Sequence, residues 1–215
     1  MLEIRNLTVN FGGSTILHGV DLTVQGFTGL VGRNGAGKTT LMRAVMGLIR
    51  TRAGQILLDG EDITATPAHR RTRQGIGYMP EDRRLIPGLT VEENLLLPAW
   101  GSRHADGAAR CARAYTFISE VADMRARRVE QLSGGQQKLV ALARALVAGG
   151  TMLLLDEPFE GVAPALALRL AEVLANLQRE GTTVLISESE MERAGSLFEY
   201  TYVIERGAVE PWRDG

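Results

Sequence analysis

The stretch Gly32-Arg33-Asn34-Gly35-Ala36-Gly37-Lys38-Thr39 decides the fold of this chain of 215 residues. It matches in full the phosphate-binding pattern in which a glycine is followed, after four residues, by Gly-Lys-Thr or Gly-Lys-Ser. The apolar run 26–31 before it predicts a short strand, and the apolar period of 38–49 predicts a helix. Glycines at such a junction let backbone N–H groups surround phosphate oxygens at a helix N-terminus. We therefore expect residues 32–39, together with Thr40, to bind phosphate groups.

The second chemical signal is an apolar run that ends in two carboxylates, Met152-Leu153-Leu154-Leu155-Asp156-Glu157. The run is typical of a buried strand, so that its carboxylates lie at the edge of a sheet. Beside a phosphate loop, Asp156 is expected to hold Mg²⁺, directly or through water, with Thr39 as a further ligand. Lys38 is expected to reach the β and γ phosphates of a nucleotide, and Glu157 to orient or deprotonate the attacking water.

The composition excludes several classes of function. The 24 Lys and Arg residues nearly balance the 25 Asp and Glu residues, which excludes broad electrostatic capture of nucleic acid. The single cysteine, Cys111, can form no internal disulfide, so a reducing, cytoplasmic compartment is expected. The N-terminus shows no signal peptide, and no apolar run approaches the length of a membrane span. If the protein works at a membrane, a second chain supplies the membrane part.

The pattern around the two motifs predicts an α/β fold, with a P-loop NTPase core built on a mainly parallel sheet. Residues 2–24 alternate in polarity on both sides of Gly12-Gly13, which predicts an N-terminal antiparallel β element. Asp59-Gly60 predicts a hairpin after the apolar residues 56–58. The other expected elements are strands at 75–79, 153–155 and 183–186 and helices at 91–97, 108–126, 134–147 and 165–179. We expect one domain over 1–215, with a helical insertion at about 91–131.

The segment Leu132-Ser133-Gly134-Gly135-Gln136-Gln137, called the signature segment below, points to a family. Ser133 can cap the helix that follows, and the N–H groups of Gly134 and Gly135 would make that helix end an anion site. With the two motifs around it, nearly the whole chain resembles an ATP-binding cassette (ABC) protein. The resemblance implies the ABC ATPase fold, ATP and Mg²⁺ as ligands, and a second cassette facing the first. Ser133, Gly134, Gly135 and Gln136 would then complete the ATP site of that second cassette.

The resemblance also implies roles for further residues of this sequence, which match functional positions of the family. Phe11 matches the aromatic residue that stacks on adenine. Glu81 stands where the family usually has glutamine, and its oxygens can still reach Mg²⁺ or its water. Residues 160–163 read Glu-Gly-Val-Ala instead of Ser-Ala-Leu-Asp. Ser189 stands where the family has a histidine that contacts the γ-phosphate, and a serine is too short for that bond without a bridging water.

The missing histidine implies either slow hydrolysis or a heavier dependence on Glu157. A shift in the alignment at Ser189 is the alternative explanation. The three histidines of the chain, His18, His69 and His104, all come too early to take the role, and we expect them at the surface or in loops.

Two longer segments, 80–95 and 156–164, are similar to the cassettes of branched-chain amino acid importers, although urea and amide importers share the pattern. We therefore predict an ATP-hydrolysing importer subunit on the inner face of the cell membrane, which drives a separate permease and does not bind the solute. The second cassette is expected to be a different chain, with a homodimer left open. The alternatives are an ABC ATPase without a membrane partner and a weakly catalytic regulatory cassette.

Arginines cluster at three places in an otherwise balanced sequence, and a solvated face is the default interpretation. The alternative is contact with acidic permease loops or lipid head groups. These clusters are Arg70, Arg71 and Arg73, then Arg83 and Arg84, then Arg125, Arg127 and Arg128. Cys111 is expected to pack inside the helical insertion.

Overall fold

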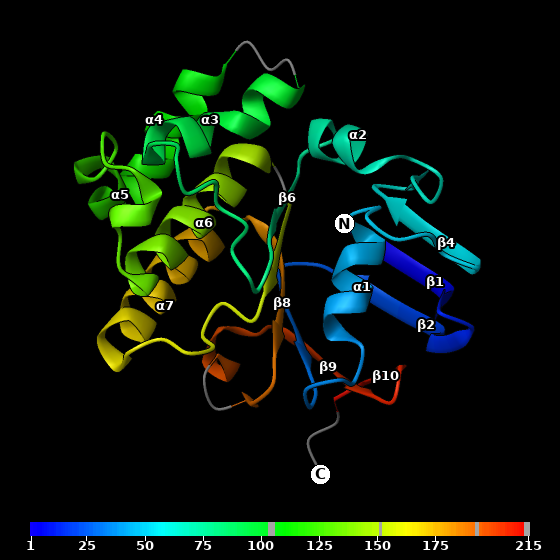
Figure 1. The fold of residues 1–215 in the computed structure, drawn as a ribbon. Helices are drawn as coiled ribbons and strands as arrows, with labels where there is room; N and C mark the ends of the chain where they lie inside the picture. Colours follow the sequence, from blue (N-terminus) through cyan, green and yellow to red (C-terminus); the bar gives the residue numbers. More distant parts are fainter. Residues whose placement is uncertain (103–105, 151, 192–193, 213–215) are drawn as a thin grey trace.

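The computed structural model describes residues 1–102, 106–150, 152–191 and 194–212, so that His104 lies outside the described residues. The expected α/β class is confirmed. A mainly parallel sheet stands at the centre; α1 and an antiparallel sheet lie on one side of it, and the helices α3 to α7 on the other (Figure 1). In this part of the chain no helix combines the length and the hydropathy that a bilayer crossing requires.

The antiparallel sheet has the strand order β2-β1-β4-β5. Its strands are β1 (Leu2–Phe11), β2 (Ser14–Val24), β4 (Ala53–Leu58) and β5 (Glu61–Asp62). The predicted turn at Gly12-Gly13 joins β1 to β2, and both glycines have positive φ angles, 56° and 89°. Asp59 and Gly60 also have positive φ angles between β4 and β5, as the predicted Asp-Gly hairpin requires.

The larger sheet has the order β10-β9-β3-β8-β7-β6, in which only β10 runs antiparallel to its neighbour. Its strands are β3 (Phe27–Val31), β6 (Ile76–Met79), β7 (Met152–Asp156), β8 (Thr183–Glu188), β9 (Tyr200–Glu205) and β10 (Ala208–Pro211). The register pairs Asp156 with Ser187 and Val31 with Glu188. The phosphate loop, Asp156 and the end of β8 therefore meet at one edge of the sheet.

The central strands bury both faces. On β7, Leu153 and Leu155 belong to the core shared with the helices, whereas Met152 and Leu154 belong to the core shared with α1 and the antiparallel sheet. Strands covered on both sides read as continuous apolar runs rather than alternating ones. This explains why β7 and β8 are recognisable in the sequence and why the half-exposed strands β9 and β10 are not.

The expected helices are present, but three of them have other bounds, and α2 was not expected; α3 runs to Ser102, five residues beyond the expected end. Their bounds are α1 (Lys38–Val45), α2 (Ala68–Arg73), α3 (Val91–Ser102), α4 (Gly107–Phe117), α5 (Ser119–Asp123), α6 (Gly134–Ala148) and α7 (Pro164–Arg179), with short 3-10 turns η1 (Val129–Gln131) and η3 (Gly195–Leu197). Helix α1 was expected to reach residue 49, but Gly47 ends it with a φ of 73°. The N–H groups of Leu48 and Gly47 bond the carbonyls of Arg43 and Ala44, which is a Schellman motif.

The single helix expected at 108–126 is two helices, with a break at Ile118. A residue from a distant part of the sequence stabilises this break. The guanidinium of Arg169, on α7, donates to the Phe117 carbonyl at 3.2 Å and forms an ion pair with Glu120. Cys111 is buried in this helical part, as expected, and His18 and His69 are exposed.

Arg71 corrects the expectation that its cluster is a solvated face. Its side chain is 2% exposed, and it donates hydrogen bonds of 2.7–3.0 Å to the carbonyls of Ala44, Val45, Thr64 and Thr66. Two of these carbonyls are the last ones of α1, so the charge of Arg71 lies where the helix dipole is negative. Arg71 therefore closes the C-terminus of the helix that carries Lys38.

Candidate active site

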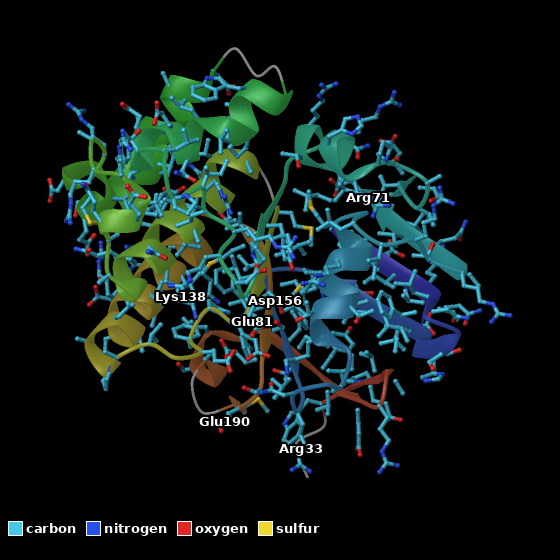
Figure 2. The ribbon with its side chains drawn as sticks, in the orientation of Figure 1. Arg33, Arg71, Glu81, Lys138, Asp156 and Glu190 are labelled. Atoms are coloured by element: carbon cyan, nitrogen blue, oxygen red, sulfur yellow. The ribbon has the colours of Figure 1, made fainter. Side chains whose placement is uncertain are left out.

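A cavity of about 480 Å³ lies against the phosphate loop and the start of α1. Four parts of the chain line it: Ile16 of β2, residues of the loop and of the first turn of α1, Glu81 after β6, and Glu157 after β7. In Figure 2 the side chain of Glu81 lies near that of Asp156, at the centre of the molecule. The fold thus brings together the phosphate loop and both carboxylates that the sequence places far apart.

The loop depends on its glycines. Gly35 and Gly37 have φ angles of 82° and 117°, and residues other than glycine rarely adopt this backbone conformation. A side chain at Gly32 would lie 2.2 Å from the carbonyl oxygen of Ile204. Gly37 is also the N-cap of α1, and no side chain caps that helix. The free N–H groups of its first turn are therefore available to an anion.

Lys38 is held at the floor of the cavity. Its ammonium lies 3.1 Å from Glu157 Oε1 and donates to the carbonyls of Gly32 and Arg33. The side chains of Lys38 and Glu157 are 3% and 5% exposed. The ion pair between Lys38 and Glu157 contributes little net free energy, because burial removes both charges from water. The phosphates of a nucleotide can therefore replace Glu157 as the partner of Lys38.

Asp156 is completely buried and accepts three side-chain hydrogen bonds. Ser187 donates at 2.6 Å and Thr39 at 3.3 Å to Oδ1, and Tyr78 donates at 3.3 Å to Oδ2. Burial raises the pKa of Asp156 above its ordinary value, whereas the three hydrogen bonds act in the opposite direction. Burial and the nearby Asp156 carboxylate likewise raise the pKa of Tyr78, which keeps its phenol protonated as a donor.

The oxygen atoms of Thr39 and Asp156 suit Mg²⁺, which prefers oxygen ligands and retains water and phosphate oxygens as the others. Glu81 lines the cavity together with Thr39 and offers a further carboxylate as a ligand. Among the described residues, no group of three His, Cys, Asp or Glu side chains could hold a metal ion by itself.

Glu157 occupies a strained position, with a φ of 50°. Its N–H donates to the backbone carbonyl of Ser187 at 3.1 Å and lies 3.2 Å from the hydroxyl of the same serine. The hydroxyl of Ser189 lies 3.5 Å from Glu157 Oε2, a long hydrogen bond. Ser189 therefore lies beside the catalytic candidate Glu157.

A second carboxyl group lies beside Glu157. The hydrogen bond between Glu160 and Glu157 is the main cause that raises the pKa of Glu160, followed by burial and by the negative charges of Glu157 and Glu81. The extra acid comes from the segment 160–163, which departs from the family pattern. The departures from that pattern therefore change the charge around Glu157.

The remaining predicted residues lie outside this cavity. Phe11 is 76% exposed at the end of β1 and lines a neighbouring cavity of about 450 Å³, which shares Ile16 and Thr40 with the first. The signature segment is not brought to the phosphate loop of its own chain. Ser133 caps α6, and its side chain and that of Gln136 bond each other's backbone N–H in a capping box. Ser133 and Gly134 are exposed there.

Three residues that contact Asp156 or Glu157 were not predicted from the sequence: Tyr78, Ser187 and Lys138. Ser187 and Tyr78 bond Asp156, and Lys138 bonds the turn that contains Glu157. Ser187 could have been found, because it is a polar residue at the end of a buried strand predicted to run parallel to the strand of Asp156. No signal in the sequence pairs Tyr78 or Lys138 with these residues.

The chain matches known proteins over almost its whole length. Residues 17–160 match the family described as ABC transporter. The lipopolysaccharide export system ATP-binding protein LptB of Haemophilus influenzae is 35% identical over 213 residues, 97% of this chain and 88% of LptB. The high-affinity branched-chain amino acid transport ATP-binding protein BraG of Pseudomonas aeruginosa is 32% identical over 211 residues, 97% of this chain and 91% of BraG.

A solved structure supports the same conclusion. The dimeric bacterial ABC transporter cassette MJ0796 has a TM-score of 0.84 with this chain at 25% identity, and the similarity covers 100% of both chains. The expected ABC ATPase fold is thereby confirmed. This chain belongs to the ATP-binding cassette transporter family and is an ATPase subunit of that family.

Proposed function

We propose that the chain is the ATP-hydrolysing subunit of an importer for branched-chain amino acids or related small amides, and that it drives a separate membrane permease. The observation that carries the proposal is the single cavity in which the phosphate loop, Glu81 and Glu157 meet, because ATP hydrolysis needs these groups together. The name of BraG supports the class of solute. The segments 80–95 and 156–164 support it too, since they resemble branched-chain amino acid cassettes.

The similarity to LptB favours a second candidate, a cassette that serves lipopolysaccharide export. LptB is 35% identical and BraG 32% identical to this chain, so identity does not separate the two candidates. In both, the cassette binds ATP and a permease and never the transported molecule. The choice between them is therefore decided by the permease.

Binding of ATP uses the loop and its neighbours. The N–H groups of residues 32–39 and the N-terminus of α1 surround the phosphates, and Lys38 leaves Glu157 to contact the β and γ phosphates. The adenine ring stacks on the exposed side chain of Phe11. Thr39, Asp156 and Glu81 would hold Mg²⁺, which neutralises phosphate charge when it is bound.

Hydrolysis depends on Glu157. Once Lys38 has moved to the phosphates, the Glu157 carboxylate is free to orient a water molecule and to accept its proton as the oxygen bonds the γ-phosphorus and ADP leaves. Ser189, through water, supports the geometry at the γ-phosphate. The helix end at Ser133 of a second cassette contacts the same phosphate when the two cassettes pair head to tail. The dimeric structure of MJ0796 supports the pairing of two cassettes.

The permease docks beside Tyr78, in a groove of about 460 Å³ between the two cores. Its walls are apolar at Leu48 and Leu97 and basic at Arg84 and Arg144, which fits an amphipathic permease segment with acidic residues. Docking there places the chain on the inner, cytoplasmic face of the membrane. Closure of the two cassettes on ATP moves the permease between its orientations, and hydrolysis reopens the pair.

The test is capture of the tagged chain from detergent-solubilised membranes of its own organism, followed by reconstitution of the captured complex in lipid vesicles. The proposal expects ATP-driven uptake of labelled leucine, valine or a small amide, with no uptake by a complex that carries Lys38→Ala. Transport of lipopolysaccharide instead would support the second candidate. Recovery of soluble partners alone, from cytosol, would overturn the transporter proposal, and transport without ATPase activity of this chain would make it a regulatory cassette.

A further inference from the structure

The two lysines of the chain, Lys38 and Lys138, contact the same residue. Every other basic residue among the 24 Lys and Arg is an arginine. The Lys38 ammonium lies 3.1 Å from the side chain of Glu157, and the Lys138 ammonium donates to the backbone carbonyl of Glu157 at 2.9 Å. The first contact belongs to the phosphate site already described. The second contact joins the backbone of Glu157 to α6, and Lys138 is not among the residues that line the phosphate cavity.

Lys138 reaches Glu157 from the signature helix. It lies on α6, five residues after Ser133, and it is 6% exposed. In Figure 2 it comes from the helical side of the sheet, opposite to the side of Arg71. Its ammonium also donates to the Glu160 carbonyl at 2.6 Å. Burial lowers the pKa of Lys138, and the nearby carboxylates of Glu188, Glu160 and Glu157 oppose that effect.

The turn that Lys138 contacts is one that needs support. Glu157 has a φ of 50°, which a residue with a side chain adopts only when its surroundings hold it there. Ser187 bonds the N–H of Glu157, and Glu188 Oε1 accepts the N–H of Phe159 at 3.0 Å. Strand β8 thus fixes the N–H groups of the turn. Lys138 fixes its carbonyls.

We infer that Lys138 is a positioning residue for hydrolysis: by binding the carbonyls of Glu157 and Glu160, it holds the turn so that the Glu157 carboxylate faces the attacking water. The inference rests on the proposed role of Glu157 as the residue that orients water. A compact ammonium with three rotatable donors can bond two carbonyls at once, whereas the donors of arginine are fixed in a larger planar group and are expected to fit this buried position less well. Both the size and the charge of the Lys138 ammonium are therefore expected to matter for holding the turn.

The experiment compares Lys138→Met, Lys138→Gln and Lys138→Arg with wild type, measuring ATP affinity by fluorescent nucleotide binding and steady-state kcat in the full chain. A shift of the Glu157 carboxylate costs rate rather than ATP binding, so K138M is expected to lower kcat by about ten- to hundredfold and to leave nucleotide affinity within about twofold. K138Q, which keeps a donor, should retain more activity than K138M. K138R, which keeps the charge, should not restore the rate.

Arg169→Met is the matched control for a purely structural loss. Arg169 also joins two helices through a carbonyl and a carboxylate, but it lies away from the cavity. This control is expected to lower the melting temperature and to leave kcat unchanged at a temperature where it is folded. If K138M does not fold, K138Q and K138R carry the test. A kcat within twofold of wild type in the folded variants overturns the inference.

A double variant separates this inference from the proposed function. If Lys138 acts through Glu157, adding K138M to Glu157→Gln lowers the residual rate no further, because the two effects are not additive. Wild-type turnover in Glu157→Gln alone would refute the proposed role of Glu157, and the inference on Lys138 with it. Loss of turnover in Glu157→Gln together with normal turnover in K138M would refute only the inference on Lys138.

Discussion

Around Glu157, single residues set an unusual balance of charge. By the resemblance to the ABC family, Glu81, Glu160 and Ser189 stand where an amide, a serine and a histidine are usual, and Ala163 stands where an aspartate is usual. Two carboxylates are thus added near Glu157, while one carboxylate and a histidine are missing. The pKa of Glu160 is raised by its hydrogen bond with Glu157 and by the negative charge of Glu81. Lys38 and Lys138 supply the compensating positive charges. The ammonium groups of Lys38 and Lys138 both contact Glu157, and their positive charges offset the repulsion among the neighbouring carboxylates.

The first prediction concerns Lys38 and Glu157. Lys38→Ala is expected to abolish ATP binding, because the phosphates lose their positive side chain. Glu157→Gln is expected to bind ATP and to lower kcat at least about hundredfold, the range typical of a lost general base, while it traps a closed pair of cassettes. Isothermal titration measures the binding, and phosphate release measures the rate. Turnover at the wild-type rate in Glu157→Gln would show that another group accepts the proton.

The second prediction concerns Ser189. The 3.5 Å contact of its hydroxyl with Glu157 is long, so Ser189→Ala is expected to change kcat by less than about threefold. Ser189→His places a side chain long enough to reach the γ-phosphate directly, and kcat is expected to rise roughly tenfold. Phosphate release at saturating ATP measures both variants. A large loss in Ser189→Ala would mean that the serine itself is a main contributor to catalysis.

At this scale the sequence predicts the residues whose chemistry is local. Lys38 and Thr39 follow from an unbroken motif, and Asp156 and Glu157 follow from the end of a buried strand. The roles of Tyr78 and Lys138 cannot be predicted in this way, because they depend on contacts with residues distant in the sequence. Tyr78 contacts a residue 78 positions away, and Lys138 contacts a residue 19 positions away. A tyrosine in a strand and a lysine on a helix have many other uses. Only the packing of β6 and α6 against β7 assigns them to the site.

At the scale of helices and strands, the ends are less predictable than the centres. The apolar period that predicts a helix over 38–49 continues past Val45, but Gly47 and the buried Arg71 end α1 earlier. The same period continues across Ile118, where Arg169 supports a break. In both places an arginine distant in the sequence binds the last carbonyls of a helix. Such a contact leaves no trace in the local pattern.

The third prediction follows from the closure of α1. Arg71→Met is expected to lower the free energy of unfolding by about 2–4 kcal/mol, because several carbonyls lose a charged donor in a buried position. The neighbouring Arg70→Met is the matched control: Arg70 is exposed, and its loss should change stability by less than about 0.5 kcal/mol. Urea unfolding followed by circular dichroism measures both. Equal stability of the two variants would contradict the role of Arg71 as the cap of α1.

At the scale of the whole molecule, the order of the strands explains why the fold was accessible from the sequence. Strands β7 and β8 are buried on both faces, and the parallel register brings their ends to the phosphate loop. Those three segments carry the motifs, so the site and the class of fold are predicted together. The half-exposed strands β9 and β10, at one end of the sheet, add little apolar signal and were missed. Their absence from the prediction does not affect the site.

The position of the signature segment leads to the last prediction, since Ser133 lies outside the cavity of its own chain. If two copies of this chain pair head to tail, as the proposed mechanism requires, each site should use Lys38 and Glu157 of one copy and Ser133 of the other. Ser133→Arg and Glu157→Gln should each be inactive alone. In a mixed pair of the two variants, one site carries both defects and the other carries none.

An equal mixture of Ser133→Arg and Glu157→Gln, paired at random, should therefore recover about one quarter of the wild-type rate. Phosphate release from the mixture, compared with each variant at the same total concentration, measures the recovery. Mixing Glu157→Gln with Lys38→Ala is the control, because both defects lie in the same half of a site and every site in a mixed pair retains one of them. Recovery in the control, or none in the test mixture, would show that the two copies do not share their sites in this way.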